Sequence, residues 1–203
     1  MTASQPIPVI VAAGGDGSRM AGNKPTQLFD GISLIERALT LVSAMSPTIA
    51  VAVQQNASWT IPVGVVRLYD ETQGAGPLSA LSSALTFAVE RQASHALVVP
   101  CDMPFLPADL LGRLVDEIGS AAVAIVKSAD RLHPICALWS VTTLSMLSDY
   151  AATSRRSLIG FAEQSGMVAV EWPAQPFDPF FNVNTQQDLV LAHKILEASR
   201  VST

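Results

Sequence analysis

Short apolar runs recur along this chain of 203 residues, and glycine, proline or polar residues bound each of them. Runs of this length that are rich in valine, isoleucine and leucine are typical of β-strands with both faces covered. The pattern predicts strands over 7–12, 48–53, 63–68, 95–101, 121–127, 134–139 and 167–172.

Segments with apolar residues at every third or fourth position alternate with these runs. Leu34, Ala38 and Val42 share one face of a helix, and Pro47 follows its end. The same spacing predicts helices over 33–44, 78–92, 108–118, 141–151, 157–164 and 185–199. Pro107 stands where a first-turn proline is expected, at the start of the third of these helices. Thr185, with Asp188 three residues later, is expected to cap the start of the last helix.

The alternation of strands and helices indicates an α/β fold. We predict a three-layer α/β/α, Rossmann-like architecture with a mainly parallel sheet, and with its active cleft along the carboxyl edge of that sheet. No repeat, low-complexity tract or linker divides the sequence, so residues 1–203 are expected to form one domain.

Composition narrows the class of protein further. An apolar content of 49% with 14% charged residues is typical of a compact globular chain. The net charge of −5 argues against a nucleic acid or an anionic membrane as partner. Residues 1–8 lack the pattern of a secretory signal, and Cys101 and Cys136 lie in separate apolar segments. Reduced thiols and a cytoplasmic location are therefore expected.

The first predicted strand leads into a glycine-rich loop, residues 14–22, which has four glycines in nine residues. Arg19 lies within this loop and Lys24 follows it. Glycines allow backbone N–H groups to approach phosphate oxygens closely, and the two cations would offset phosphate charge. The loop therefore predicts a nucleotide-like anion at the first β-to-α turn.

Two common phosphate-binding patterns do not fit this loop. A G-x-G-x-x-G pattern begun at Gly15 has Met20 in place of its third glycine, which disfavours a nicotinamide oxidoreductase. A P-loop pattern begun at Gly17 has Asn23 where lysine is required. The sequence also lacks zinc-ligand spacing and the G-x-S-x-G motif of acyl transfer.

Polar residues that could complete a phosphate site lie far downstream. Asp102 follows the strand predicted over 95–101, at the edge of an α/β sheet where ligands bind. A lone carboxylate beside phosphates is a natural Mg²⁺ ligand, although a turn or capping aspartate is the alternative. Asn182 and Asn184 are two positions apart in an extended segment, so they are expected to point to the same side.

Five motifs in order resemble one enzyme family. They are Ala12–Gly15 with Arg19–Lys24, then Gly76-Pro77-Leu78, Pro100-Cys101-Asp102-Met103-Pro104-Phe105-Leu106-Pro107, His133-Pro134 and Phe180-Phe181-Asn182-Val183-Asn184-Thr185. Together they resemble the molybdenum cofactor guanylyltransferases, within the wider nucleotidyltransferase family. Ala12, Asp16 and Asn23 depart from the residues usual in that family, and Asp16 places a negative charge beside the proposed phosphates.

The resemblance implies transfer of GMP from Mg²⁺·GTP to the phosphate of molybdopterin cofactor, with release of pyrophosphate. It implies catalytic roles for Lys24, Arg19 and Asp102, Asp102 also being the Mg²⁺ ligand, and substrate contacts from Asn182 and Asn184. The nucleotide-binding residues that it implies are Ala12, Ala13, Gly14, Gly15, Lys24, Gln54, Asp70 and Asp102. Molybdenum-cofactor delivery proteins are expected partners, whereas nucleic acid and membrane are not.

Several interpretations stay open from the sequence alone. Asp70 could accept hydrogen bonds from the N–H groups of guanine or from the exocyclic amine of cytosine. Cytidylyl transfer to the same cofactor, nucleotidyl transfer to a sugar phosphate, and a nucleotide-binding chaperone or sensor module are the alternatives.

Overall fold

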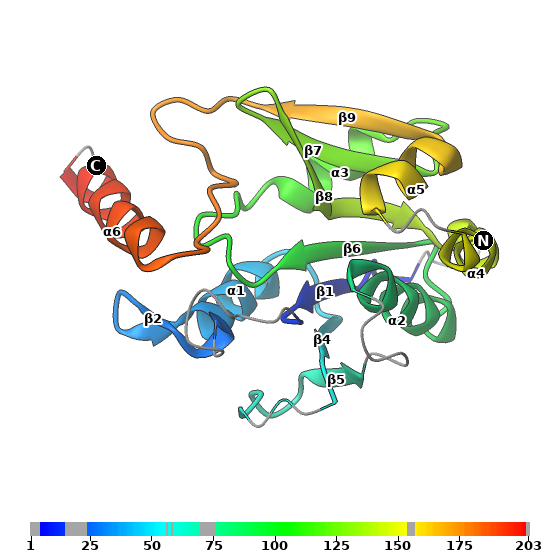
Figure 1. Ribbon diagram of the computed structural model, residues 1–203, viewed down its shortest axis with the longest axis horizontal. Coiled ribbons are helices and arrows are strands. Elements are labelled where there is room, and N and C mark those ends of the chain that lie inside the picture. Colours follow the sequence, from blue (N-terminus) through cyan, green and yellow to red (C-terminus); the bar gives the residue numbers. More distant parts are fainter. Residues whose placement is uncertain are drawn as a thin grey trace.

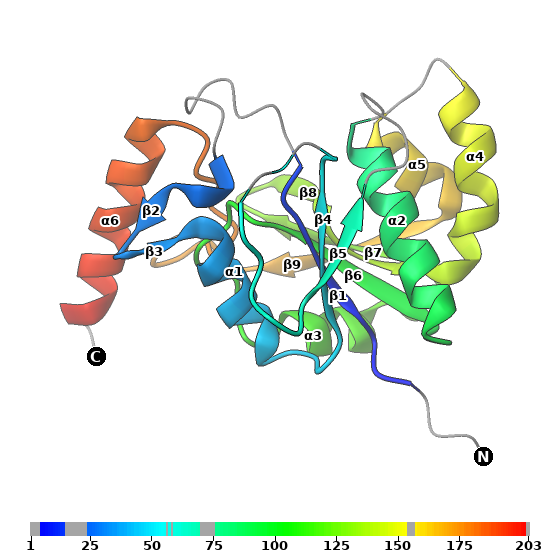
Figure 2. The same cartoon turned by 90° about the horizontal axis from the view of Figure 1, so that it is seen from below.

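A central sheet organises the protein. The computed structural model describes residues 5–14, 24–55, 57, 59–69, 76–153 and 157–201. Seven of the strands in this part of the chain form one sheet in the order β5-β4-β1-β6-β8-β7-β9 (Figures 1 and 2). They are β1 (Val9–Ala12), β4 (Ile49–Val53), β5 (Val66–Tyr69), β6 (His95–Pro100), β7 (Val123–Ser128), β8 (Arg131–Ser140) and β9 (Met167–Trp172).

All seven predicted strands are present, and the sheet is mainly parallel as expected. Of these strands, only β8 runs antiparallel to its neighbours, β6 and β7. Ala129 and Asp130, at φ 46° and 58°, join β7 to β8 in a two-residue hairpin. A parallel pairing would need a crossover of roughly a dozen residues, so this connection fixes the direction of β8. Pro134 lies inside β8 where the register with β7 shifts, a site that tolerates proline.

Helices cover both faces of the sheet, which confirms the three-layer prediction. Those in the described residues are α1 (Leu34–Ser43), α2 (Pro77–Glu90), α3 (Leu110–Glu117), α4 (Leu144–Ala152), α5 (Leu158–Ser165) and α6 (Gln186–Val201). Figure 2 shows α1 and α3 on one face of the sheet and α2, α4 and α5 on the other. Side chains of β1 alternate between these faces, because Val9 and Val11 belong to the buried cluster that includes α1 and α3, and Ile10 belongs to the cluster that includes α2, α4 and α5. No helix in the described part of the chain is long and apolar enough to span a bilayer.

Helix starts follow local capping chemistry. Ser33 and Glu36 form a reciprocal capping box at α1. The Thr185 hydroxyl accepts from the Asp188 N–H at 3.1 Å, and the Asp188 carboxylate accepts from the Thr185 N–H at 2.8 Å, as predicted for the last helix. The expected role of Pro107 was wrong, because α3 begins three residues later, after Asp109. Pro107 instead accepts a turn hydrogen bond from the Leu110 N–H at 3.2 Å.

A small hairpin precedes α1. Its strands β2 (Leu28–Phe29) and β3 (Ile32–Ser33) are joined by Asp30 and Gly31, at φ 53° and 83°. Phe29 is fully buried against Val183 and Ala192, so the hairpin packs on α6 at the side of the sheet (Figure 1). This contact ties the segment after the glycine-rich loop to the C-terminal part of the chain.

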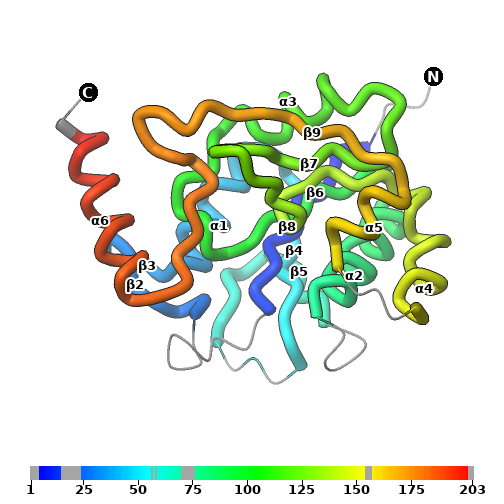
Figure 3. The backbone as a smooth tube through the Cα atoms, turned by 45° about the horizontal axis from the view of Figure 1, so that its top comes forward, coloured from blue at the N-terminus to red at the C-terminus, as the bar shows by residue number. Residues whose placement is uncertain are grey.

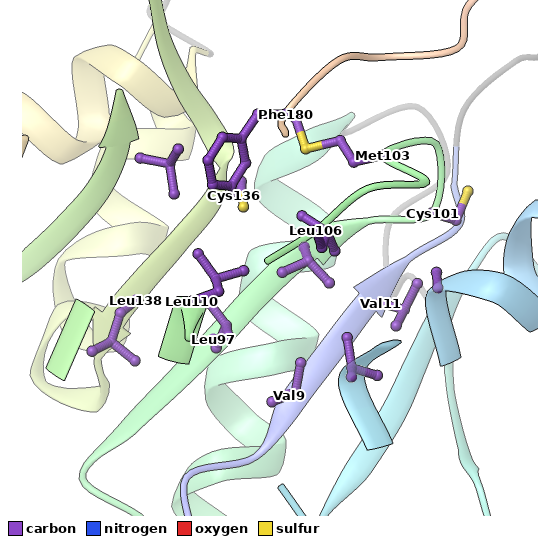
Figure 4. Packing of buried hydrophobic residues seen from close by; sticks show 14 of the residues in the cluster. Val9, Val11, Leu97, Cys101, Met103, Leu106, Leu110, Cys136, Leu138 and Phe180 are labelled. Carbon is purple, nitrogen blue, oxygen red and sulfur yellow. The ribbon is translucent and has the colours of Figure 1, made fainter. Parts of the chain in front are cut away.

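Both cysteines lie in the core beneath the carboxyl edge. Cys101 and Cys136 are free thiols, and both belong to the cluster that includes Met103, Leu106 and Phe180 (Figure 4). Burial raises the pKa of Cys101 to about 12, with the Asp102 carboxylate adding to the shift, and burial also raises the pKa of Cys136. The expectation of reduced, buried thiols is therefore confirmed.

These thiols are expected to be inert in the folded protein. Shielding by the core and a scarcity of thiolate should leave less than about a tenth of a thiol per chain reactive with Ellman's reagent over an hour near pH 8. Unfolding in guanidinium chloride should release both, that is, two thiols per chain. Rapid native reaction of one thiol would contradict the burial of that cysteine.

Candidate active site

The ends of β1, β4 and β6 form the base of the site. The Ala13 N–H donates to the Ala52 carbonyl at 2.9 Å, and the Cys101 N–H donates to the Ala12 carbonyl at 3.1 Å. These bonds continue the parallel ladders past the strand ends, because neighbouring parallel strands leave their next backbone groups aligned. The start of the glycine-rich loop and the Cys101–Asp102 turn consequently lie side by side.

Three polar side chains from distant parts of the sequence meet above this edge. Lys24, the first residue of the short 3-10 helix η2 (Lys24–Thr26), forms an ion pair with the Asp102 carboxylate. The Lys24 ammonium also donates to Asn184 Oδ1 at 2.7 Å. Asp102 is only 9% exposed, so a paired cation there offsets the cost of burying its charge.

The segment that carries both asparagines, residues 178–184, is held against Asp102 by the backbone. The Val183 N–H donates to the Asp102 carbonyl at 2.9 Å, and the Val183 side chain is fully buried. Figures 1 and 3 show the chain passing from β9 across the end of β6 before it enters α6. We call residues 178–184 the asparagine segment.

Two buried oxygens in the site have no hydrogen-bond partner among the described residues. They are Asp102 Oδ1 and Asn182 Oδ1. Such atoms are uncommon, because buried polar groups are normally satisfied by protein or water. Carboxylate and amide oxygens are ligands that Mg²⁺ accepts, and Mg²⁺ typically takes one or two carboxylates with substrate phosphates and water. Asp102 therefore fits the predicted metal, although the described residues contain no group of three acidic, histidine or cysteine ligands.

A basic residue that the sequence pattern did not single out supports the turn after Asp102. Arg37 of α1 donates through Nε to the Pro104 carbonyl at 2.6 Å, and its guanidinium lies 4.9 Å from the Phe29 ring centroid. Burial lowers the pKa of Arg37 from its ordinary value, while Asp30 opposes that shift. Arg37 thus links α1, the β2–β3 hairpin and the segment 102–107. In the sequence, Arg37 is a lone arginine between the apolar positions of a predicted helix, and that pattern gives no signal of this role.

The structure brings together part of the predicted site. Five of the predicted residues lie at the carboxyl edge of the sheet: Ala12, Ala13, Lys24, Asp102 and Asn184.

Of the remaining predicted residues, some lie near the same edge and others lie outside the described part of the chain. Asn182 is half-buried two residues before Asn184, and Gln54 directly follows β4 at the same edge. Gly14 is exposed just past the end of β1. Gly15, Arg19 and Asp70 lie outside the described residues.

Comparison with known proteins identifies the family that this chain matches. The sequence profile of the MobA-like NTP transferase domain matches residues 9–166. A molybdenum cofactor guanylyltransferase of Sinorhizobium fredii is 34% identical over 199 residues, which cover 93% of this chain and 91% of the relative. Another, from Rhizobium johnstonii, is 35% identical over 199 residues, or 94% of this chain and 93% of the relative.

Solved structures show the same fold. Molybdopterin-guanine dinucleotide biosynthesis protein A from Archaeoglobus fulgidus superimposes with a TM-score of 0.75 at 22% identity, covering 95% of this chain and all of that one (100%). The predicted fold class is thereby confirmed. Since the family profile and the relatives span most of the sequence, the chain belongs to the MobA-like NTP transferase family and is a nucleotidyltransferase.

Proposed function

We propose that this nucleotidyltransferase transfers GMP from GTP to the terminal phosphate of molybdopterin cofactor. The observation that carries the proposal is the convergence of Lys24, Asp102 and Asn184 at the carboxyl edge of the sheet. The names of the relatives, molybdenum cofactor guanylyltransferases, supply the substrates.

The reaction needs no covalent intermediate on the protein. An oxygen of the acceptor phosphate attacks the α-phosphorus of GTP and forms a new P–O bond. The bond from the α-phosphorus to the oxygen bridging to the β-phosphorus breaks, and its electron pair leaves with pyrophosphate. Catalysis then depends on aligning the two phosphates and stabilising the negative charge that develops between them.

Lys24 and Asp102 divide this task. Their ion pair holds an ammonium and a carboxylate together. When phosphates arrive, the Lys24 ammonium can turn from Asp102 to the phosphate oxygens, which releases the carboxylate. Asp102 would hold Mg²⁺, which when bound neutralises charge on the phosphates.

The asparagine segment would present the acceptor. Asn184 contacts Lys24, the proposed phosphate ligand, and this supports a role for its amide group where acceptor and nucleotide phosphates would meet. The Asn182 amide oxygen, which lacks a partner among the described side chains, can accept from substrate or from a bound water.

The remaining assignments follow the resemblance. Arg19 would bind the leaving pyrophosphate, Gly15 and Gln54 the nucleotide, and Asp70 the N–H groups of guanine. We place the reaction in the reducing cytoplasm, which suits two free thiols, and we expect delivery proteins to receive the product.

Nucleotide preference is the direct test of the guanine assignment. Thermal unfolding should shift upward by several degrees with GTP and Mg²⁺, and by clearly less with CTP, UTP or ATP at the same concentration. Mixing GTP, Mg²⁺ and molybdopterin cofactor should release pyrophosphate. Preferential stabilisation by CTP, together with CTP-dependent pyrophosphate release, would replace guanylyl by cytidylyl transfer.

A further inference from the structure

A buried hydrogen-bond chain of three side chains lies beside the site. One member, His133, belongs to a motif to which the resemblance gave no role, and the other two, Ser128 and Asp178, belong to no motif. Ser128, the last residue of β7, is fully buried, and its hydroxyl donates to Asp178 Oδ1 at 2.7 Å. The same hydroxyl lies 2.8 Å from Nε2 of His133, a residue of β8 that is 6% exposed. The three side chains therefore connect two sheet strands to the start of the asparagine segment.

The direction of the protons in this chain can be assigned. A carboxylate accepts only, so the Ser128 proton points to Asp178 and the Ser128 oxygen must accept from His133. Burial lowers the pKa of the His133 imidazole, which favours the neutral ring, and the Asp178 carboxylate partly opposes this shift. His133 is consequently the tautomer with its proton on Nε2.

This proton order is not that of a nucleophilic triad. In such a triad the serine hydroxyl donates its hydrogen bond to the histidine. Here the histidine donates to the serine oxygen, and the serine hydroxyl donates to the aspartate. Ser128 is also fully enclosed, at 0% exposure, so no substrate can reach its oxygen. The hydrogen-bond chain of Ser128, His133 and Asp178 therefore holds the segments that it connects in place and does not perform covalent chemistry.

Asp178 passes this constraint to the asparagine segment. Its Oδ1 also accepts from the Phe180 N–H at 2.9 Å, and its carbonyl accepts from the Phe181 N–H at 3.1 Å. The resulting turn places the Phe180 ring 5.6 Å from the His133 ring and 5.3 Å from the Trp172 ring, between centroids.

The asparagine segment is consequently fixed at both ends. One end is the Asp178 turn on Ser128, and the other is the bond from the Val183 N–H to the Asp102 carbonyl. Asn182 lies between the two anchors, and Asn184 directly follows the second. A shift at the Asp178 end would therefore displace the asparagines relative to Asp102 and Lys24.

We propose that Ser128, His133 and Asp178 are positioning residues for the acceptor side of the reaction, because they fix the register of the asparagine segment against Asp102. The inference rests on the proposed function for its kinetic consequence. Since misplacement by about 1 Å can cost about a hundredfold in rate, a defect at this distance from the chemistry should be measurable.

Ser128→Ala removes the central hydroxyl with minimal change of volume. We expect kcat/KM for the acceptor cofactor to fall about ten- to a hundredfold, while KM for GTP stays within about twofold. The Val183 amide, five residues beyond Asp178, should exchange with solvent about tenfold faster. A purely structural defect would affect both substrates alike.

Ser46→Ala is the matched control. Ser46 is also buried, donates to the Ile7 carbonyl at 2.7 Å and accepts from the Thr48 N–H at 3.1 Å, at the amino edge of the sheet. Its variant should lose similar stability but keep the acceptor kcat/KM. A conservative variant, Asp178→Asn, keeps an acceptor oxygen and should stay within about threefold of wild type, whereas Asp178→Ala should match Ser128→Ala.

The possible outcomes separate the two proposals. If Ser128→Ala keeps both the Val183 exchange rate and the acceptor kcat/KM of the Ser46→Ala control, the positioning role is overturned. If wild-type protein transfers no GMP, the proposed function fails, and Val183 exchange in Ser128→Ala still decides whether the register depends on this chain.

Discussion

Replacing Asp102 with asparagine should lower the rate of GMP transfer about a thousandfold. The variant keeps the shape and one oxygen of the side chain but loses the charge that pairs with Lys24 and would hold Mg²⁺. Initial rates of pyrophosphate release at saturating GTP measure the effect. Calorimetric titration should also show that Mg²⁺ no longer strengthens GTP binding.

Asp109→Asn provides the matched control for this change. Asp109 is seven positions further along, exposed at the start of α3, and its side chain makes no capping hydrogen bond. The same chemical substitution there should leave turnover within about twofold of wild type, as for most exposed surface changes. Near wild-type turnover by Asp102→Asn would remove Asp102 from the reaction and with it the proposed metal site.

Removing the Lys24 ammonium should be nearly as damaging. We expect Lys24→Ala to lower kcat by about 10²–10³, because the cation would stabilise charge that develops on the phosphates in the transition state. GTP binding should weaken as well, and adding Lys24→Ala to Asp102→Asn should cost less than the sum of the two effects, since the side chains are in contact. Single-turnover kinetics with GTP and acceptor separate these quantities.

Lys194→Ala removes the same charge from an exposed position on α6 and should leave kcat unchanged. A Lys24→Ala enzyme with normal kcat and normal GTP affinity would falsify the phosphate role of Lys24. In that case the ion pair with Asp102 would serve stability alone, and Lys24→Ala should then lower the unfolding temperature without any kinetic defect.

Much of the fold could be predicted because its signals are local. Continuous apolar runs located all seven strands of the sheet, and 3.6-residue periodicity located the six helices of the described chain. The β2–β3 hairpin was missed although Asp30-Gly31 is a strong two-residue turn signal, because each strand has only two residues. The separation of 127 and 134 is also too short for a crossover, so the direction of β8 could have been anticipated.

The site could be predicted only in part. Motif spacing identified Lys24, Asp102 and Asn184, but which atoms touch depends on a contact between residues 24 and 184, which are 160 positions apart. The support from Arg37, Ser128 and Asp178 carried no sequence signal, because a lone arginine, serine or aspartate is compatible with many surface and turn positions. Their partners are backbone and side-chain groups from other elements.

The sequence by itself determined the α/β class, the glycine-rich loop at the first turn, and the residue types that nucleotidyl transfer requires. Only the tertiary structure decided that Lys24 pairs with Asp102, that two buried oxygens at the site have no partner among the described residues, and that Ser128 anchors the asparagine segment. The physical reason is the separation along the sequence over which each effect acts. Periodicity and turns act over a few residues, whereas charge pairing and burial depend on which distant segments the folded sheet brings together.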